Sequence, residues 1–255
     1  MLPEQRRSEM AAFIQQNGGV DTETLARQFG ISVMTARRDL KLLEEQNILK
    51  VTWGGAVPVN FLPHEIPYAN KACVMLEAKK AIAAVAAEMV RDESCIALDA
   101  GTTTLALAEA LRGRTLTVIT NDLQIGLILS ASPTVSVHII GGWVDPLSRA
   151  CNDDTSLDFL ANVNVTQAFI GTSVWDAGRG ATTSSTAKMH LKRKLMACSS
   201  EAVLLADSSK FGNFSPWTIG DLAEFSCVVT DMGLSKTARE AVKETGAALR
   251  LASRG

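Results

Sequence analysis

The sequence predicts an α/β protein in which a small helical head precedes a larger, mainly parallel α/β body. Three observations support this. The first 57 residues contain short amphipathic helical segments, three prolines (Pro58, Pro63 and Pro67) then follow without strong periodicity, and short apolar runs afterwards alternate with helix-compatible segments. We therefore divide the 255 residues into a head (1–57), an extended linker (58–71) and a body (72–255).

The composition excludes several classes of protein. Lys plus Arg number 25 and Asp plus Glu number 27, so the net charge of −2 leaves only a local patch for nucleic acid. No apolar run approaches the roughly 18 residues of a membrane span, so we expect no membrane partner. Five scattered cysteines without a CxxC pair and three widely spaced histidines predict no metal, no other cofactor and a reducing, cytoplasmic location.

The head contains three predicted helices and one predicted strand. Met10, Phe13 and Ile14 repeat at helical spacing, Gly18 and Gly19 stop that helix, and Ser32 is a plausible N-cap for the third helix. The helices are predicted over residues 4–17, 22–29 and 33–46, and the strand over 48–51, where Gly54 and Gly55 allow a hairpin. The short connection between the second and third helices is typical of a helix-turn-helix.

The third helix has two opposite faces. At about 100° per residue, Ala36, Leu40 and Leu43 form an apolar stripe. The opposite face carries Met34, Arg37, Arg38 and Lys41. Such a face attracts DNA phosphates, and its arginines can read guanine edges. The alternative is an ordinary solvated face, and the seven basic and seven acidic residues among the first 60 do not decide between the two.

A family resemblance favours DNA. The run Leu-Ala-Arg-Gln-Phe-Gly-Ile-Ser-Val-Met-Thr-Ala-Arg-Arg-Asp-Leu (25–40), followed by Gly-Gly-Ala (54–56), resembles the head of the DeoR family of bacterial transcription regulators, a winged helix-turn-helix. The resemblance implies that Ser32 caps the recognition helix, and that Asp39 holds a neighbouring arginine or a helix end. Trp53 stands where the family commonly has histidine. The residues expected at DNA are Ser32, Met34, Thr35, Arg37, Arg38 and Lys41.

The body alternates strands and helices. Strands are predicted over residues 95–98, 116–119, 135–140, 168–170, 202–206, 227–229 and 247–251. Helices are predicted over 72–89, 104–111, 123–130, 185–198 and 236–245. Continuous apolar strands between helices are typical of a parallel sheet that is covered on both faces.

Polar residues follow several of these strands. Asp99, Gly101, Thr102, Thr103 and Thr104 lie between a strand and a helix, where free backbone N–H groups can hold an anion, although glycine and threonine also serve as ordinary turn and cap residues there. Similar strand ends carry Asn121, Gly141, Gly142, Asp207 and Lys210. Because parallel strands end at one edge of a sheet, we expect these residues to line one pocket. Lys210 is either a point charge for phosphate or an ordinary surface lysine.

The same strand ends resemble the DeoR effector domain, in the family's order. That domain is similar in fold to ribose-5-phosphate isomerase and other phosphosugar-binding domains. The resemblance implies that Gly101, Thr102, Thr103 and Thr104 hold phosphate, while Asp99, Asn121, Asp207 and Lys210 line the pocket. Two departures from the family, around Arg149 and ahead of Lys188, place a cation where a more acidic ligand can be reached.

We therefore expect a DNA-binding transcriptional regulator, a repressor of carbohydrate genes, with a double-stranded operator and a small phosphorylated sugar or sugar acid as partners. Because symmetric regulators read paired half-sites, we expect a homo-oligomer, a dimer or tetramer. The alternative is a sugar-phosphate isomerase, which needs a general base. Residues 180–196, the region corresponding to the catalytic segment of related isomerases, contain no glutamate and no glycine repeat. A third interpretation is a phosphosugar sensor whose head contacts protein.

Overall fold

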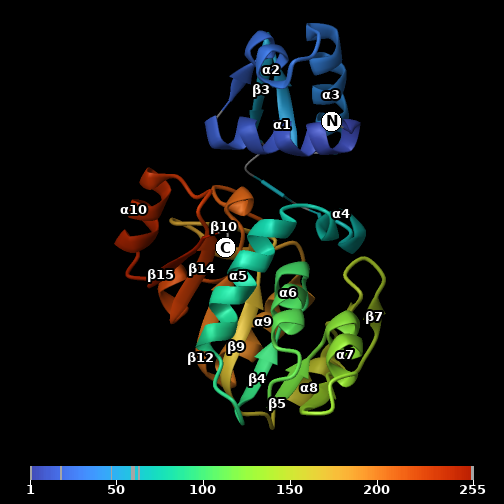
Figure 1. Ribbon diagram of the computed structural model, residues 1–255, viewed down its shortest axis with the longest axis vertical. Coiled ribbons are helices and arrows are strands. Elements are labelled where there is room, and N and C mark those ends of the chain that lie inside the picture. The colour runs from blue at the N-terminus through green and yellow to red at the C-terminus, as the bar shows by residue number, and fades with distance from the viewer. Residues whose placement is uncertain (1, 18, 47, 59–60, 63, 254–255) are drawn as a thin grey trace. The chain divides into compact units, whose positions relative to one another are not determined.

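The computed structural model describes residues 2–17, 19–46, 48–58, 61–62 and 64–253. The chain forms two compact units, residues 1–62 and 63–255, which are described separately (Figure 1). Two residues named above, Gly18 and Pro63, lie outside the described residues. Among the described residues, no helix combines the length and the apolarity that crossing a membrane requires.

The first unit is a winged helix-turn-helix, as expected. Its elements are α1 (Pro3–Asn17), β1 (Val20–Asp21), α2 (Thr22–Phe29), α3 (Val33–Glu45), β2 (Leu49–Thr52) and β3 (Gly55–Pro58). The strands form an antiparallel sheet in the order β1-β3-β2, whose β2–β3 hairpin is the wing. The core of this unit consists of Met10, Ile14, Leu25, Leu40, Leu43, Leu49 and Ala56.

The second unit is built on a seven-stranded parallel sheet in the order β15-β14-β12-β9-β4-β5-β6. Its strands are β4 (Cys95–Leu98), β5 (Leu116–Thr120), β6 (Val135–Ile139), β9 (Val165–Gly171), β12 (Ser199–Leu205), β14 (Cys227–Asp231) and β15 (Leu249–Ala252). All seven predicted strands are present. Their continuous apolar runs exist because both faces of a parallel sheet are buried.

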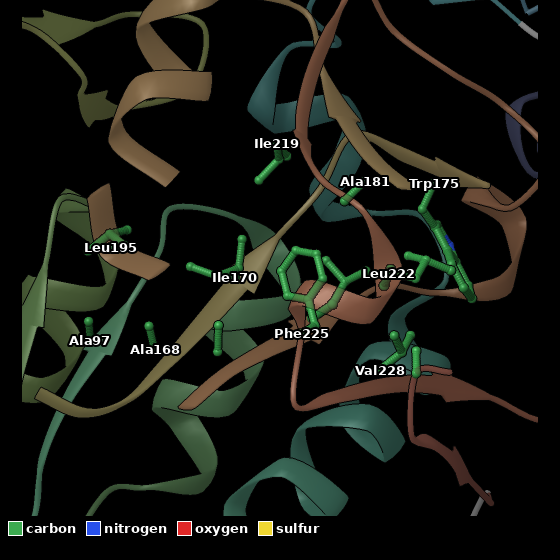
Figure 2. Packing of buried hydrophobic residues seen from close by; sticks show 14 of the residues in the cluster. Ala97, Ala168, Ile170, Trp175, Ala181, Leu195, Ile219, Leu222, Phe225 and Val228 are labelled. Atoms are coloured by element: carbon green, nitrogen blue, oxygen red, sulfur yellow. The ribbon is translucent and has the colours of Figure 1, made fainter. Parts of the chain in front are cut away.

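Helices cover both faces of this sheet (Figure 1). One face packs against α5 (Leu76–Met89), α6 (Thr102–Ala110) and α7 (Leu123–Ser130). The other packs against α8 (Asp154–Leu160), α9 (Thr186–Ala197) and α10 (Lys236–Glu244). Successive strand residues alternate between the two cores, so that Ile96 and Leu98 face the first and Ala97 faces the second. Figure 2 shows part of the second core, where Ala97, Ala168 and Ile170 come from the sheet.

The strand order contains a reversal that positions the site. The chain leaves β4 for α6 on one face and, after β9, reaches α9 on the other, although β4 and β9 are neighbours in the sheet. Ligands of open α/β sheets bind beyond the carboxyl ends of strands at such a switch point. A ligand site is therefore expected among the residues that follow β4 and β9.

The structure differs from the sequence prediction in its short elements. We expected extended chain over 58–71, but α4 (Tyr68–Ala72) is helical and groups with the second unit. Three short strands form a separate antiparallel sheet, and a further pair forms a hairpin. They are β10 (Val174–Asp176), β11 (Gly180–Thr183) and β13 (Trp217–Gly220), and β7 (Val144–Asp145) with β8 (Ala150–Cys151). Elements of two to five residues carry too little periodicity to be recognised in sequence.

Candidate DNA-binding face and ligand pocket

The recognition helix α3 separates its two faces as the helical spacing predicted. Ala36, Leu40 and Leu43 are buried in the core of the first unit. On the opposite side, the side chains of Met34, Arg37, Arg38 and Lys41 are exposed. Ser32 caps the helix, since its Oγ accepts a hydrogen bond of 3.1 Å from the Thr35 backbone N–H. The first unit therefore presents three cations on one helical face.

Asp39 holds α1 against α3. Its buried carboxylate accepts a hydrogen bond from Arg6 Nε at 2.7 Å and lies 3.7 Å from Arg7 Nη1. The hydrogen bond to Asp39 raises the pKa of Arg6. Because these two arginines come from α1, the Asp39 charge is neutralised without drawing on Arg37 or Arg38. This agrees with the expectation that Asp39 holds an arginine.

The two glycines of the wing meet two different requirements. Gly54 has φ +102°, a conformation that side chains with a Cβ rarely adopt. Gly55 lies so close to β1 that a Cβ on it would come within 2.4 Å of the Val20 carbonyl oxygen. Trp53, at the turn that precedes them, is fully exposed. The backbone of the wing tip is thus fixed by glycine, while the Trp53 side chain is free of packing.

A pocket lies at the switch point of the sheet in the second unit. Residues after β4 and β9 line it, together with side chains from α4, α9 and the segment before α4. The lining residues are Glu65, Tyr68, Lys71, Asp99, Ala100, Gly101, Thr102, Thr103, Thr104, Ser148, Asn152, Gly171, Thr172, Ser173, Thr183, Lys188, Lys192 and Lys210.

Several hydrogen-bonding groups in the pocket are unused. Helix α6 begins there, and no described side chain caps its N-terminus. The hydroxyls of Thr103, Thr183 and Tyr68 are buried and have no hydrogen-bond partner among the described residues. Buried polar groups normally have partners, so such groups gathered in one pocket indicate that a polar ligand completes them.

Four lysines give the pocket an excess of positive charge. They are Lys71, Lys188, Lys192 and Lys210, against two lining carboxylates, Glu65 and Asp99. Lys192 is buried and pairs with Asp99, while Lys210 Nζ donates to the Thr172 carbonyl at 3.1 Å. Burial lowers the pKa of Lys71, and neighbouring lysines lower it further. This excess of cations favours an anionic ligand.

The structure brings together some of the residues expected in the pocket. Asp99, Gly101, Thr102, Thr103, Thr104 and Lys210 line it. Asp207 pairs with Lys210, since its Oδ2 lies 3.5 Å from the lysine Nζ. The Asn121 amide donates to the Cys151 carbonyl, and the Gly141 carbonyl accepts from Ser156 Oγ. The described lining of the pocket does not include Asn121, Gly141, Gly142 or Asp207. These residues follow β5, β6 and β12, not the two strands of the β4–β9 reversal.

Sequence reasoning missed much of the cationic side of the pocket. Lys188 and Lys192 are four residues apart on α9 and so share one helical face, a spacing that the sequence contains. Glu65, Tyr68 and Lys71 lie in the segment interpreted as linker. Lys188, where the chain departs from the family, is predicted to reach a more acidic ligand, and the structure places it in the pocket lining. Arg149, for which the same is predicted, stacks over the Tyr68 ring at 4.9 Å.

Comparison with known proteins agrees with this division into a head and a pocket-bearing body. Residues 6–60 match the DeoR-like helix-turn-helix domain, and residues 75–232 match the DeoR C terminal sensor domain. An exposed cationic recognition helix followed by a sensor domain defines the chain as a DNA-binding transcriptional regulator.

The chain belongs to the DeoR family. It is 35% identical to the HTH-type transcriptional regulator YgbI of Escherichia coli, over 95% of each chain. It is 32% identical to the transcriptional repressor AccR of Agrobacterium fabrum, covering 94% of this chain and 93% of AccR. Among solved structures, ribose 5 phosphate isomerase A of Neisseria gonorrhoeae matches with a TM-score of 0.39 and 16% identity, covering 58% of this chain and 56% of the isomerase.

Proposed function

We propose that the second unit binds a small phosphorylated sugar or sugar acid, with the phosphate at the N-terminus of α6. The observation that carries this is the pair of buried, unpartnered hydroxyls of Thr103 and Thr183, which line the same pocket as that uncapped terminus. Backbone N–H groups at a helix start suit a phosphate, and charge-assisted hydrogen bonds strengthen the contact. The residues proposed to hold the phosphate are Gly101, Thr102, Thr103, Thr104 and Lys210.

The remaining pocket residues receive supporting roles in this proposal. Asp99 and Asp207 orient Lys192 and Lys210, with which they pair. Asn121 holds the end of β8 through the Cys151 carbonyl. Gly141 and Gly142 shape the neighbouring strand end.

We further propose that α3 enters the major groove of an operator. Met34, Thr35, Arg37, Arg38 and Lys41 then face DNA, and Ser32 caps the helix. The support is the exposed cationic face of α3, whose acidic neighbour Asp39 is already neutralised by arginines of α1. Arginines on such a face contribute both phosphate attraction and base reading.

The regulation we propose is repression of carbohydrate genes, relieved or modulated by the ligand of the second unit. A ligand shifts DNA affinity only if it binds the DNA-competent and DNA-incompetent states differently. We also propose a homo-oligomer, dimer or tetramer, working in the cytoplasm where the operator is, because paired half-sites require paired heads. Light scattering that shows only monomer, with and without DNA, would contradict the oligomer.

We infer regulation rather than catalysis for the pocket. An isomerase needs a carboxylate or another base that is free to take a proton from carbon. Both lining carboxylates are held by lysines. Burial raises the pKa of Glu65, but Lys71, Lys188 and Ser184 outweigh it and lower that pKa to about 2. A carboxylate of such low pKa is a weak base. Purified protein is therefore expected to leave pentose and hexose phosphates unconverted.

The decisive experiment uses the Thr103→Val variant. Valine keeps the shape of threonine but removes a hydroxyl that has no partner, so the free energy of unfolding should stay the same or rise. Affinity for ribose 5-phosphate, glucose 6-phosphate or 6-phosphogluconate, whichever the wild type binds by calorimetry, should fall about tenfold because one hydrogen bond to a charged group is lost.

Thr230→Val is the matched control. Its hydroxyl is also buried and unpartnered, but it does not line the pocket. Ligand affinity should therefore match that of the wild type. Equal affinities in the two valine variants would place the phosphate elsewhere, and a wild type that binds none of the three probes would exclude this ligand class.

A further inference from the structure

Glu65 places a carboxylate inside the cationic pocket. Its Oε1 lies 2.5 Å from Lys71 Nζ, and its Oε2 lies 3.0 Å from Lys188 Nζ and accepts a hydrogen bond of 2.7 Å from Ser184 Oγ. Its side chain is 11% exposed. Lys71 of α4, Lys188 of α9 and the Ser184 hydroxyl just before α9 therefore surround one carboxylate, as they would surround the anionic group of a ligand.

The side chain of Glu65 is held through its charge by Lys71 and Lys188. The residue precedes α4, in a segment without helix or strand between residues 64 and 67. The cations of the site come instead from the folded body, since Lys188 lies in the first turn of α9. Lys188 Nζ also lies 3.5 Å from Oδ2 of Asp145, in the β7–β8 hairpin. Lys188 therefore belongs to a regular helix of the body, whereas Glu65 lies in a loop.

We propose that Glu65 occupies an anion subsite of the ligand pocket, and that a phosphorylated sugar acid takes this subsite with its carboxylate by displacing Glu65. The position of the ligand phosphate at α6 rests on the proposed function. The position of the ligand carboxylate rests on Lys71, Lys188 and Ser184 alone. Because Glu65 is the third residue after Leu62, where the first unit ends, its displacement frees the start of the connection to the head.

The ligand class follows from competition between anions. A sugar phosphate without a second anion leaves Glu65 in place, because nothing it carries competes for Lys188. A ligand carboxylate instead takes over the contacts of Glu65 with Lys71 and Lys188, while the released Glu65 carboxylate regains its hydration. Binding of the ligand is further strengthened by the phosphate held at α6. The pocket thus discriminates phosphorylated sugar acids from the corresponding phosphorylated alcohols.

The first test is chemical rescue of Glu65→Ala in the full chain. This truncation removes a CH₂–COO⁻ group, which acetate can replace. Sodium acetate at neutral pH should raise the melting temperature, relative to sodium chloride of equal ionic strength, more in Glu65→Ala than in the wild type, which reports the general effect of the salt. Glu109→Ala, which removes the carboxylate of an exposed ion pair with Arg112, is the control and should respond as the wild type does.

The second test compares matched open-chain ligands that differ only at carbon 1, such as gluconate 6-phosphate and glucitol 6-phosphate, with four- and five-carbon pairs alongside. The acid should bind wild type about tenfold more tightly than the alcohol, the usual effect of one charge-assisted bond. In Lys188→Met the preference should fall below about threefold, and in Glu65→Gln the acid should bind more tightly still. Deuterium exchange in residues 64–67, ahead of α4, should speed up with the acid and not with the alcohol.

The outcomes separate the two proposals. Acetate that raises the melting temperature of Glu65→Ala no more than that of the wild type, or an acid and an alcohol that bind equally, would overturn the subsite while leaving the phosphate site intact. Acetate rescue without binding of any phosphorylated probe would support the subsite and contradict the phosphate site. Rescue, acid preference and its loss in Lys188→Met together establish both.

Discussion

Replacing Lys192 by methionine should destabilise the second unit strongly. Lys192, on α9, pairs with Asp99, which follows β4, and the two side chains are 8% and 1% exposed. The Asp99 carboxylate also accepts the Gly171 N–H at 2.8 Å. Methionine fills a similar volume but carries no charge, so the variant leaves a buried carboxylate with a single backbone donor.

The size of the effect follows from this burial. Removing one partner of a buried ion pair costs about 3–5 kcal/mol, because the other charge remains desolvated. In a unit of this length, such a loss lowers the melting temperature by about 6–20 °C. Adding Asp99→Asn removes the stranded charge, and an apolar or neutral replacement of a whole buried pair is often nearly neutral. The double variant should therefore lie within about 2 kcal/mol of wild type.

Urea unfolding followed by tryptophan fluorescence measures the effect. Trp175 is fully buried in the core of the second unit, so its emission shifts when that unit unfolds. Lys80→Met is the control, since the exposed pair of Lys80 with Glu77 on α5 should contribute little. A loss below about 1 kcal/mol in Lys192→Met, or a double variant no more stable than the single, would refute the reasoning.

Three further predictions concern other groups. The double variant Arg37→Ala/Arg38→Ala should keep its unfolding curve yet lose specific binding in a gel shift with the promoter of its own gene, since each lost base contact costs about 1–3 kcal/mol. Lys210→Ala should weaken binding of the phosphorylated ligand about tenfold and leave DNA affinity of the ligand-free protein unchanged; equal calorimetric affinities would make it an ordinary lysine. In the folded protein the pKa of Glu65 is about 2, below its ordinary value of 4.5. The ionised carboxylate therefore contributes its full stabilisation of the fold at pH values above 4.5. The stability advantage of wild type over Glu65→Gln should accordingly shrink as pH falls from 4.5 to 2, and an advantage independent of pH would contradict this.

The sequence could predict what depends on local pattern. The seven strands of the large sheet are apolar runs between turn residues, and the two faces of α3 follow from helical spacing. The start of α6 was recognisable because glycine and threonines follow a strand directly.

What depends on the order of strands could not be predicted. Gly141 and Gly142 were assigned to the pocket because they follow a strand, but that strand lies at the sheet edge, away from the β4–β9 reversal. The cationic side of the pocket needs α9 and α4 brought to the same place, and only tertiary packing does this. Three prolines and weak periodicity made 58–71 resemble a plain linker, although Glu65 and Lys71 belong to the site.

The wing tip separates the demands of folding from those of recognition. Gly54 and Gly55 cannot be exchanged without strain or collision, whereas Trp53 contacts little and its replacement should change stability by no more than about 0.5 kcal/mol. Position 53 can therefore accept other side chains while the backbone of the wing tip stays the same. Substitutions at position 53 can thus test whether the wing contributes to operator preference without changing the stability of the head.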